Sequence, residues 1–453
     1  MQNEKVLNPL GEAPIGRLMV QFAVPSIIAM LVGAIYNIVD QFFIGQSVGI
    51  LGNSATNVAF PLTTMCVALA LLFGIGGAAN FNLSMGRKKP EEAKHFIGNA
   101  IFLMLSFGIT LCLLVFLFLD PLLKLFGATA DILTYSRTYT SITAFGFPFV
   151  ILATGGSNLV RADGSPNFSM ACTLIGCLIN LVLDPLFIFV FHMGMAGAAW
   201  ATIIGQIISA SMVIWYLTRF KTVKLTLKEL RPRAFACRRI LSLGMSPFLN
   251  QLAIMIVQVV MNNVLVFYGG QSVYGSEIPL ACAGIISKVN MIFFSISIGL
   301  SQGMQPIASF NYGAENYGRV REAVIKTMTA STLICIVAFI LFQLFPRQIT
   351  GIFGSGSEEY FTFASRYFRI FLFFTFLNGI QPVAGNFFTA IGKPVYGIFI
   401  SLTRQILFLL PLILILPRFF GIDGVLYSAP IADFMAAVLA FFLTFRQLNK
   451  LGK

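Results

Sequence analysis

The run LTTMCVALALLFGIGGAANF (residues 62–81) contains no charged side chain and is long enough to cross a lipid bilayer as a single helix. Its Gly74-Ile75-Gly76-Gly77 segment indicates close helix packing, because no GK[ST] follows to make a phosphate loop. The whole chain has the same character: 57% of its 453 residues are hydrophobic and 10% are charged. Soluble proteins carry about 25% charged residues, so this composition excludes a soluble globular enzyme.

Similar runs recur along the rest of the chain. Each is apolar over about 20 residues or more, which is the length that a spanning helix requires. The sequence therefore predicts an all-α integral membrane protein with short loops and no sizeable soluble domain. The twelve predicted spans are residues 18–44, 54–83, 95–119, 132–156, 168–192, 195–218, 240–268, 278–308, 324–345, 360–388, 397–417 and 422–445.

The 30 Lys and Arg residues outnumber the 17 Asp and Glu residues, which gives a net charge of +13. In a soluble protein this excess would favour nucleic acid as a partner. Here the basic residues lie mostly in alternate loops, as the positive-inside rule requires of a multi-pass protein, and the opposite loops hold only Lys124, Arg347 and Arg418. We expect no nucleic acid partner and place both termini in the cytoplasm.

A basic connector divides the chain into two groups of six predicted helices. Residues 1–218 form the first lobe, 219–239 the cytoplasmic linker and 240–453 the second lobe. Because six is an even number, both lobes start on the same side of the membrane. The two lobes are therefore expected to be related by a pseudo-two-fold axis along the membrane normal and to face a central cavity.

Sequence matches between the halves support this repeat. The turn Gly164-Ser165-Pro166 matches Gly392-Lys393-Pro394. The segment GMAGAAWATIIGQ from Gly194 matches GIDGVLYSAPIAD from Gly421.

Three of the seventeen acidic residues, Asp40, Asp184 and Asp433, fall inside predicted spans. A charge at the bilayer centre costs at least about 2.5–3.5 kcal/mol, so these residues are the first functional candidates. Asp40 lies near the outer end of its helix, Asp184 lies about 12 Å from the end of the fifth span, and Thr202 lies about 10 Å into the sixth. Asp40, Asp184 and Thr202 can therefore lie at the same depth in the outer half of the first lobe.

Further polar side chains lie one helical turn from these three residues and complete a pocket of oxygen ligands. They are Tyr36 and Asn37 beside Asp40, Asn180 beside Asp184, and Gln206 beside Thr202.

We call Asp40 and Asp184 the acid pair. Two neighbouring carboxylates in a low-dielectric pocket cannot both stay ionised alone, because desolvation and mutual repulsion each disfavour the charged form. The pair is expected to hold a proton, or a hard cation such as Na⁺ with Asn180 and Thr202 as further ligands. The alternative is that each aspartate is hydrogen-bonded and only fixes the packing of its helix.

The second lobe lacks a matching pair of carboxylates. Asn262, one turn after Gln258, stands at the position equivalent to the first acid. Asp433 restores one acid, which either forms a structural ion pair with Arg404 or takes part in substrate binding or coupling. Lys288 either faces the cavity or is paired and silent.

Four segments together resemble the multidrug and toxic-compound extrusion (MATE) family: YNIVDQFFIG (36–45), RADGSP (161–166), NLVLDPLFIF (180–189) and GMAGAAWAT (194–202). The resemblance is greatest to the DinF-like branch, which includes the MepA-type exporters, because the acids lie in the first lobe. NorM-like members carry acids in the seventh and tenth helices, but these two spans have no Asp or Glu here.

The resemblance implies drug export by cation antiport in a bacterial or archaeal cell membrane. It implies that Asp40, Asn180, Asp184 and Thr202 form the H⁺ or Na⁺ site and that the first helix can bend near Pro25. We expect a monomeric transporter of lipophilic, mostly cationic drugs, with no enzymatic activity and no cofactor other than the transported ion. Such an exporter would contribute to antibiotic resistance.

The main alternative is a flippase of lipid-linked saccharides with the same two-lobe plan. A flippase would need a cationic cavity for pyrophosphate, whereas the sequence offers three acids against Lys288 and Arg404. A major-facilitator transporter, a membrane glycosyltransferase and a channel are further alternatives, but none of their motifs is visible.

Overall fold

A computed structural model describes residues 9–275, 277–353 and 357–451 as helices and connecting turns, with no strand among them. Eleven helices in these ranges are long and apolar enough to cross a membrane, or twelve spans result if one bent pair of helices is counted as a single span. The predicted all-α membrane fold is thus confirmed. Residues 1–8 of the predicted first lobe and residues 452–453 of the second, which include both chain ends, lie outside the described residues.

In the first half, the described residues form long helices whose lengths follow the apolar runs. Prolines 90 and 166 stand at the first positions of α4 and α7, where a missing backbone N–H costs nothing. The helices are α1 (Pro9–Glu12), α2 (Ile15–Val48), α3 (Ile50–Gly86), α4 (Pro90–Leu117), α5 (Leu119–Leu125), α6 (Ala130–Ala162), α7 (Pro166–Pro185) and α8 (Gly194–Leu217).

The second half repeats this pattern with more breaks. The two segments α13 and η2–α14 meet at an angle of 42° and together form the bent pair. The elements are α9 (Ala234–Gly270), α10 (Glu277–Gly313), α11 (Tyr317–Leu344), α12 (Pro346–Phe353), α13 (Glu358–Phe371), η2 (Thr375–Leu377), α14 (Ile380–Ala390), α15 (Pro394–Leu402), η3 (Thr403–Leu409), α16 (Leu410–Ile415), α17 (Pro417–Phe420) and α18 (Ile422–Leu451).

Backbone geometry at the predicted repeat turns is the same in both halves. Gly164 and Gly392 have φ of +80° and +75°, and Gly194 and Gly421 have φ of +55° and +57°. Glycine adopts this left-handed conformation without the strain that a Cβ atom would bring. Each half also contains a π-helical segment, η1 (Leu186–Val190) in the first and η3 in the second.

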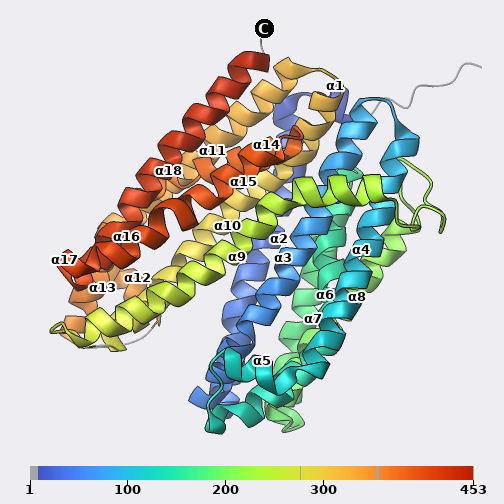
Figure 1. Cartoon of the computed structure of the whole chain (residues 1–453). Coiled ribbons are helices and arrows are strands. Elements are labelled where there is room, and N and C mark those ends of the chain that lie inside the picture. The colour runs from blue at the N-terminus through green and yellow to red at the C-terminus, as the bar shows by residue number, and fades with distance from the viewer. Residues whose placement is uncertain (1–8, 276, 354–356, 452–453) are drawn as a thin grey trace, which may run out of the picture.

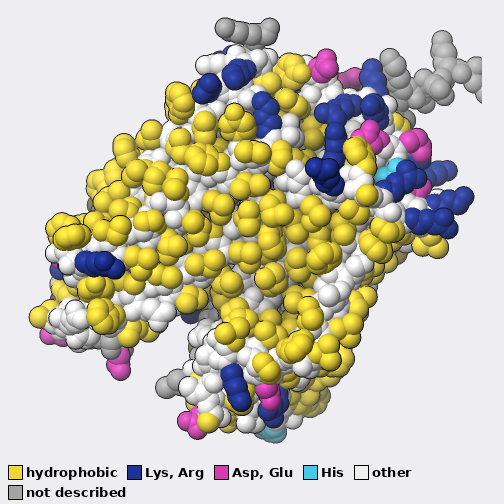
Figure 2. Space-filling model, viewed as in Figure 1, with side chains coloured by type: hydrophobic (Ala, Val, Ile, Leu, Met, Phe, Trp, Pro, Cys, Tyr) yellow, Lys and Arg dark blue, Asp and Glu magenta, His cyan; other side chains and the backbone are white. Residues whose placement is uncertain are grey.

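The helices form two bundles that join at one end and diverge at the other (Figure 1). Hydrophobic side chains cover the middle of the visible face, charged side chains gather at both ends, and the surface is hollowed between the diverging arms (Figure 2). We call the joined end, which carries the connector 219–239, the basic end, and the other the open end. The hydrophobic belt is the surface expected of a multi-pass membrane protein.

The basic end closes because glycines let the helices of the two halves touch. A Cβ atom at Gly244 of α9 would lie 1.7 Å from the carbonyl oxygen of Leu72 in α3. A Cβ atom at Gly303 of α10 would lie 2.6 Å from the Cα of Ala23 in α2. In the predicted glycine segment, a Cβ atom at Gly76 would lie 2.2 Å from the carbonyl oxygen of Ile240, so this segment does serve close packing.

Helix α2 crosses from one half to the other. Near the basic end, Leu18 and Phe22 lie in the hydrophobic core of the second half, together with Met304 of α10. Toward the open end, Ile44 packs with Ile188 and other residues of the first half. The inner part of α2 thus belongs to the first lobe by its position in the sequence but packs against the second lobe.

Candidate cation site

The site lies in the arm of the first half, where α2, α7 and α8 contact one another. Helix α2 supplies Tyr36 and Asp40, one turn apart, and α7 supplies Asn180 and Asp184 with the same spacing. Thr202 comes from the facing helix α8. The i,i+4 spacing places each pair on one helix face, so three helices suffice to bring five polar side chains together.

Asp184 is deeply buried and is held by its neighbours. Asp184 is 1% exposed and Asn180 is 2% exposed. In the amide orientation that satisfies both groups, Asn180 Nδ2 donates to Asp184 Oδ2 at 2.7 Å. The Asn180 oxygen then accepts from the backbone N–H of Thr202 at 2.9 Å. Asn180 therefore fixes the position of Asp184 relative to α8.

The carboxyl groups of Asp40 and Asp184 lie within hydrogen-bonding reach of each other. One oxygen of Asp40, Oδ1, is buried and has no hydrogen-bond partner among the described residues. No ion pair found in the described part of the chain includes either carboxyl group. The acid pair therefore lacks a fixed positive partner, and only a proton or a cation can balance it.

The surrounding groups are neutral oxygen donors. The hydroxyl of Thr202 lies within hydrogen-bonding reach of those of Tyr36 and Tyr139. Carboxylate, amide and hydroxyl oxygens are the ligands that hard cations such as Na⁺ prefer. Within the described residues, no cluster of three or more His, Cys, Asp or Glu side chains suits a transition metal.

Comparison with known proteins agrees with this arrangement. The MatE family model matches residues 25–186 and 252–415, one segment in each half, and the two segments begin 227 residues apart. The chain belongs to the MatE family.

Similar proteins cover almost the whole MatE chain. Multidrug export protein MepA of Staphylococcus haemolyticus (strain JCSC1435) is 26% identical over 441 residues, which cover 97% of this chain and 95% of the relative. MepA of Staphylococcus aureus (strain MSSA476) is 25% identical over 97% of this chain and 96% of its own. A solved structure described as the outward-facing conformation of a multidrug resistance MATE family transporter of the MOP superfamily has a TM-score of 0.91, with 22% identity over 98% of both chains.

Two other predicted residues of this MatE protein, Asn37 and Gln206, make no hydrogen bond to the acid pair within the described part of the chain. The Asn37 side chain is exposed and donates to the Gly33 carbonyl of its own helix at 2.7 Å. Gln206 is half-buried, one turn beyond Thr202. Helix α2 runs without interruption through Pro25.

Tyr139 of α6 is a site residue that the sequence reasoning missed. It lies seven residues after the start of the fourth predicted span, which is about 10 Å into the membrane at 1.5 Å per residue. The same depth argument that singled out Thr202 would have found it.

The acid of the second half is paired. Arg404 Nε donates to Asp433 Oδ1 at 2.6 Å, and Asn378 Nδ2 donates to Asp433 Oδ2 at 3.0 Å. Asp433 is 2% exposed. This geometry is that of the structural ion pair, the first of the two alternatives for Asp433.

Gln258 Nε2 donates to Asn262 Oδ1 at 3.0 Å, so these two amides satisfy each other along α9. Lys288 of α10 is half-buried and has no ion pair within the described ranges.

Arg161 departs from the sequence expectation. The predicted fourth span ended at residue 156, with Arg161 in the following loop, but α6 continues to Ala162 and Arg161 is 5% exposed. The helix extends because the basic end is packed on all sides there, and backbone groups excluded from water need intrahelical hydrogen bonds.

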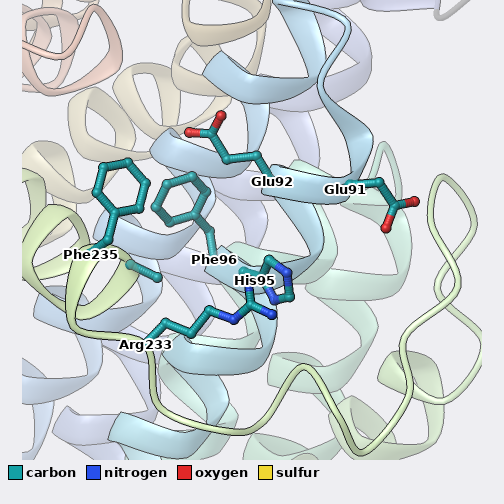
Figure 3. A pocket seen from close by; sticks show the side chains of 7 residues that line it. Glu91, Glu92, His95, Phe96, Arg233 and Phe235 are labelled. Atoms are coloured by element: carbon teal, nitrogen blue, oxygen red, sulfur yellow. The ribbon is translucent and has the colours of Figure 1, made fainter.

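The basic end also carries a surface pocket of about 290 Å³. Figure 3 shows Arg233 beside His95 of α4 and Phe235 of α9 beside Phe96, while Glu91 and Glu92 point away from these residues. None of the residues that line this pocket belongs to α2, α7 or α8, so the pocket is separate from the cation site.

Proposed function

We propose that this MatE protein is a secondary active antiporter that exchanges external H⁺ or Na⁺ for lipophilic, mostly cationic drugs. The observation that carries the proposal is the acid pair: the buried carboxyl group of Asp184 lies beside that of the half-buried Asp40, and neither has a basic partner in the described part of the chain. The relatives' names, which describe multidrug export, support the drug as cargo.

The acid pair can couple ion entry to drug release. The positive-inside rule places the basic end in the cytoplasm, so the hollow between the arms faces outward. An external cation or proton that binds the pair neutralises it and lowers its attraction for a positively charged drug. Differential binding of this kind in two conformations is what coupling requires.

Helix α2 is suited to transmit the state of the acid pair. Its outer part carries Asp40 and packs on the first half, while its inner part is anchored in the second half, where Arg319 Nη2 donates to the Ala13 carbonyl at 2.6 Å. A change in how Asp40 fits against Asp184 therefore acts on both lobes. Pro25 lies close to the crossing and is the point where α2 bends most easily, because proline lacks the N–H that closes a helical turn.

Replacing Asp40 tests the proposal directly. Asp40→Asn keeps the shape of the side chain and removes its charge, so gradient-driven efflux of ethidium from everted vesicles should be lost. The matched control is Asp131→Asn, an exposed acid at the first turn of α6, which should export ethidium at the parental rate. Undiminished efflux by a folded Asp40→Asn protein would refute the role of the pair.

The identity of the coupling ion requires a second measurement. Purified protein in liposomes is given a proton gradient or a sodium gradient, one at a time, and drug flux is followed. Drug flux under one of these gradients supports antiport, and flux that responds to neither contradicts it.

The basic residues of the spans support the flippase alternative less well than they support antiport. A flippase calls for free cations in the cavity, whereas Arg404 is committed to Asp433. Lys288 alone is a poor match for a pyrophosphate, which needs several charge-assisted hydrogen bonds.

A further inference from the structure

Arg161 links the two halves of the molecule at the basic end. It occupies the last turn of α6, and its Nη1 donates to Asn158 Oδ1 in the same helix at 3.2 Å. The same nitrogen donates across the interface to Gln302 Oε1 of α10 at 3.1 Å. All three residues are less than 9% exposed, so the contact is sealed from water in this conformation.

The charge of Arg161 is not compensated. Both acceptors are neutral amides, Nε is buried without an acceptor, and no ion pair found in the described residues includes this side chain. The nearby Asp163 is already occupied, since it accepts hydrogen bonds from Tyr216 and from the backbone N–H groups of Lys221 and Thr222. Burial of an ionised group without a counter-charge is costly, so Arg161 raises the free energy of the conformation closed at the basic end.

The equivalent turn of the second half indicates that the packing of this turn does not require a charged residue. The matched turns place Thr389 opposite Arg161 and Asn386 opposite Asn158. The Thr389 hydroxyl donates to the Gly385 carbonyl of its own helix at 3.1 Å, and among the described residues no hydrogen bond joins it to the other half. The same turn therefore folds with a neutral residue in the second half.

We propose that Arg161 is a positioning residue of the transport cycle, whose unpaired charge limits the stability of the closed basic end. This inference rests on the proposed antiport, in which the two lobes open the central cavity to opposite sides of the membrane in turn, that is, by alternating access. When the basic end opens, water reaches the guanidinium group and the penalty disappears. The close glycine contacts favour closure, and Arg161 opposes it, so both conformations stay accessible as transport demands.

The simplest competing explanation predicts the opposite sign. If the Arg161–Gln302 hydrogen bond only holds the two halves together, then removal of the charge loosens the closed end. If the uncompensated charge dominates, then Arg161→Gln, which keeps an amide at this place, tightens it. Gln302→Glu supplies the missing carboxylate and should tighten the closed end as well.

Distances between spin labels measure this balance. The labels are placed at Lys228 of the connector and Arg321 of α11, which are both exposed, in a variant whose seven cysteines have been replaced. The distance between them reports opening of the basic end. We expect Arg161→Gln and Gln302→Glu each to lower the open fraction by about tenfold or more. Thr389→Val, the matched control in the second half, should leave that fraction unchanged.

An increase in the open fraction, or no change, in either variant would overturn the inference. Arg161→Met removes the charge and the hydrogen bond together, so the two explanations again predict opposite signs, and it decides the question if Arg161→Gln does not fold. A parental chain with a single interlobe distance would also contradict it. These readouts do not depend on the coupling ion, so failure here is separate from failure of Asp40→Asn to abolish efflux.

Discussion

Asp184 in the first half and Asp433 in the second are about equally buried, at 1% and 2% exposure, yet their surroundings differ in kind. Asp433 has a fixed cation, because Arg404 Nε lies 2.6 Å from its carboxylate. Asp184 has a second carboxyl group, that of Asp40, and an amide from Asn180. One half thus pairs its buried acid with an arginine, and the other places two carboxyl groups together without a basic partner in the described part of the chain.

Under the proposed antiport, this difference makes only the first half suited to coupling. A residue that carries its own counter-ion has the same net charge throughout the cycle and has nothing to exchange. The acid pair changes its net charge when a proton or cation binds, and this change alters the affinity of the cavity for a charged drug. The repeated fold therefore supplies two similar scaffolds, of which one carries the unpaired acids that the proposed ion exchange requires.

The largest effect is expected from breaking the permanent pair. Asp433→Asn leaves the Arg404 guanidinium without its partner and should reduce the free energy of unfolding by about 3–5 kcal/mol. The measurement is a denaturation midpoint in detergent, compared with Asp184→Asn, which removes an uncompensated acid and should not lower the midpoint. The double variant Asp433→Asn with Arg404→Gln should recover most of the loss. Equal destabilisation by both single variants would remove the distinction between the two acids.

The second effect concerns transport. Asp184→Asn should lower gradient-driven drug efflux by about 5–150-fold, the range of a typical coupling free energy. It should also abolish the ion flux that drug addition induces in liposomes. A variant that keeps full coupling would show that Asp40 alone exchanges the ion.

The acid pair could be predicted from the sequence because helical geometry fixes it. The i,i+4 spacing places Asn180 beside Asp184, and the rise per residue places Thr202 at the same depth. Asn37, three residues before Asp40, also lies on the same helix face, but its amide donates to Gly33 of its own helix. Local spacing defines a helix face and leaves open which side chains on that face meet a neighbour.

Features set by packing between the two halves could not be predicted. Arg161 follows an apolar run and carries a charge, so the sequence favours a loop, yet interlobe contacts bury it. Likewise, the inner part of α2 belongs to the first half by its position and to the second by its contacts. Both depend on the relative placement of two bundles, which no periodicity within one helix encodes.

The smallest effect tests a further difference between the halves, at the turns that begin α7 and α15. Asp163 accepts hydrogen bonds from Tyr216, Lys221 and Thr222 and so fixes the start of the connector, whereas its counterpart Ile391 is buried among apolar residues. Asp163→Ala leaves these donors unpaired and should cost about 1–3 kcal/mol of unfolding free energy. Asp163→Asn retains one acceptor oxygen and should cost less. Because the connector joins the lobes, faster proteolysis between residues 219 and 239 in Asp163→Ala is the accompanying measurement, and an unchanged cleavage rate would show that the connector is held by other contacts.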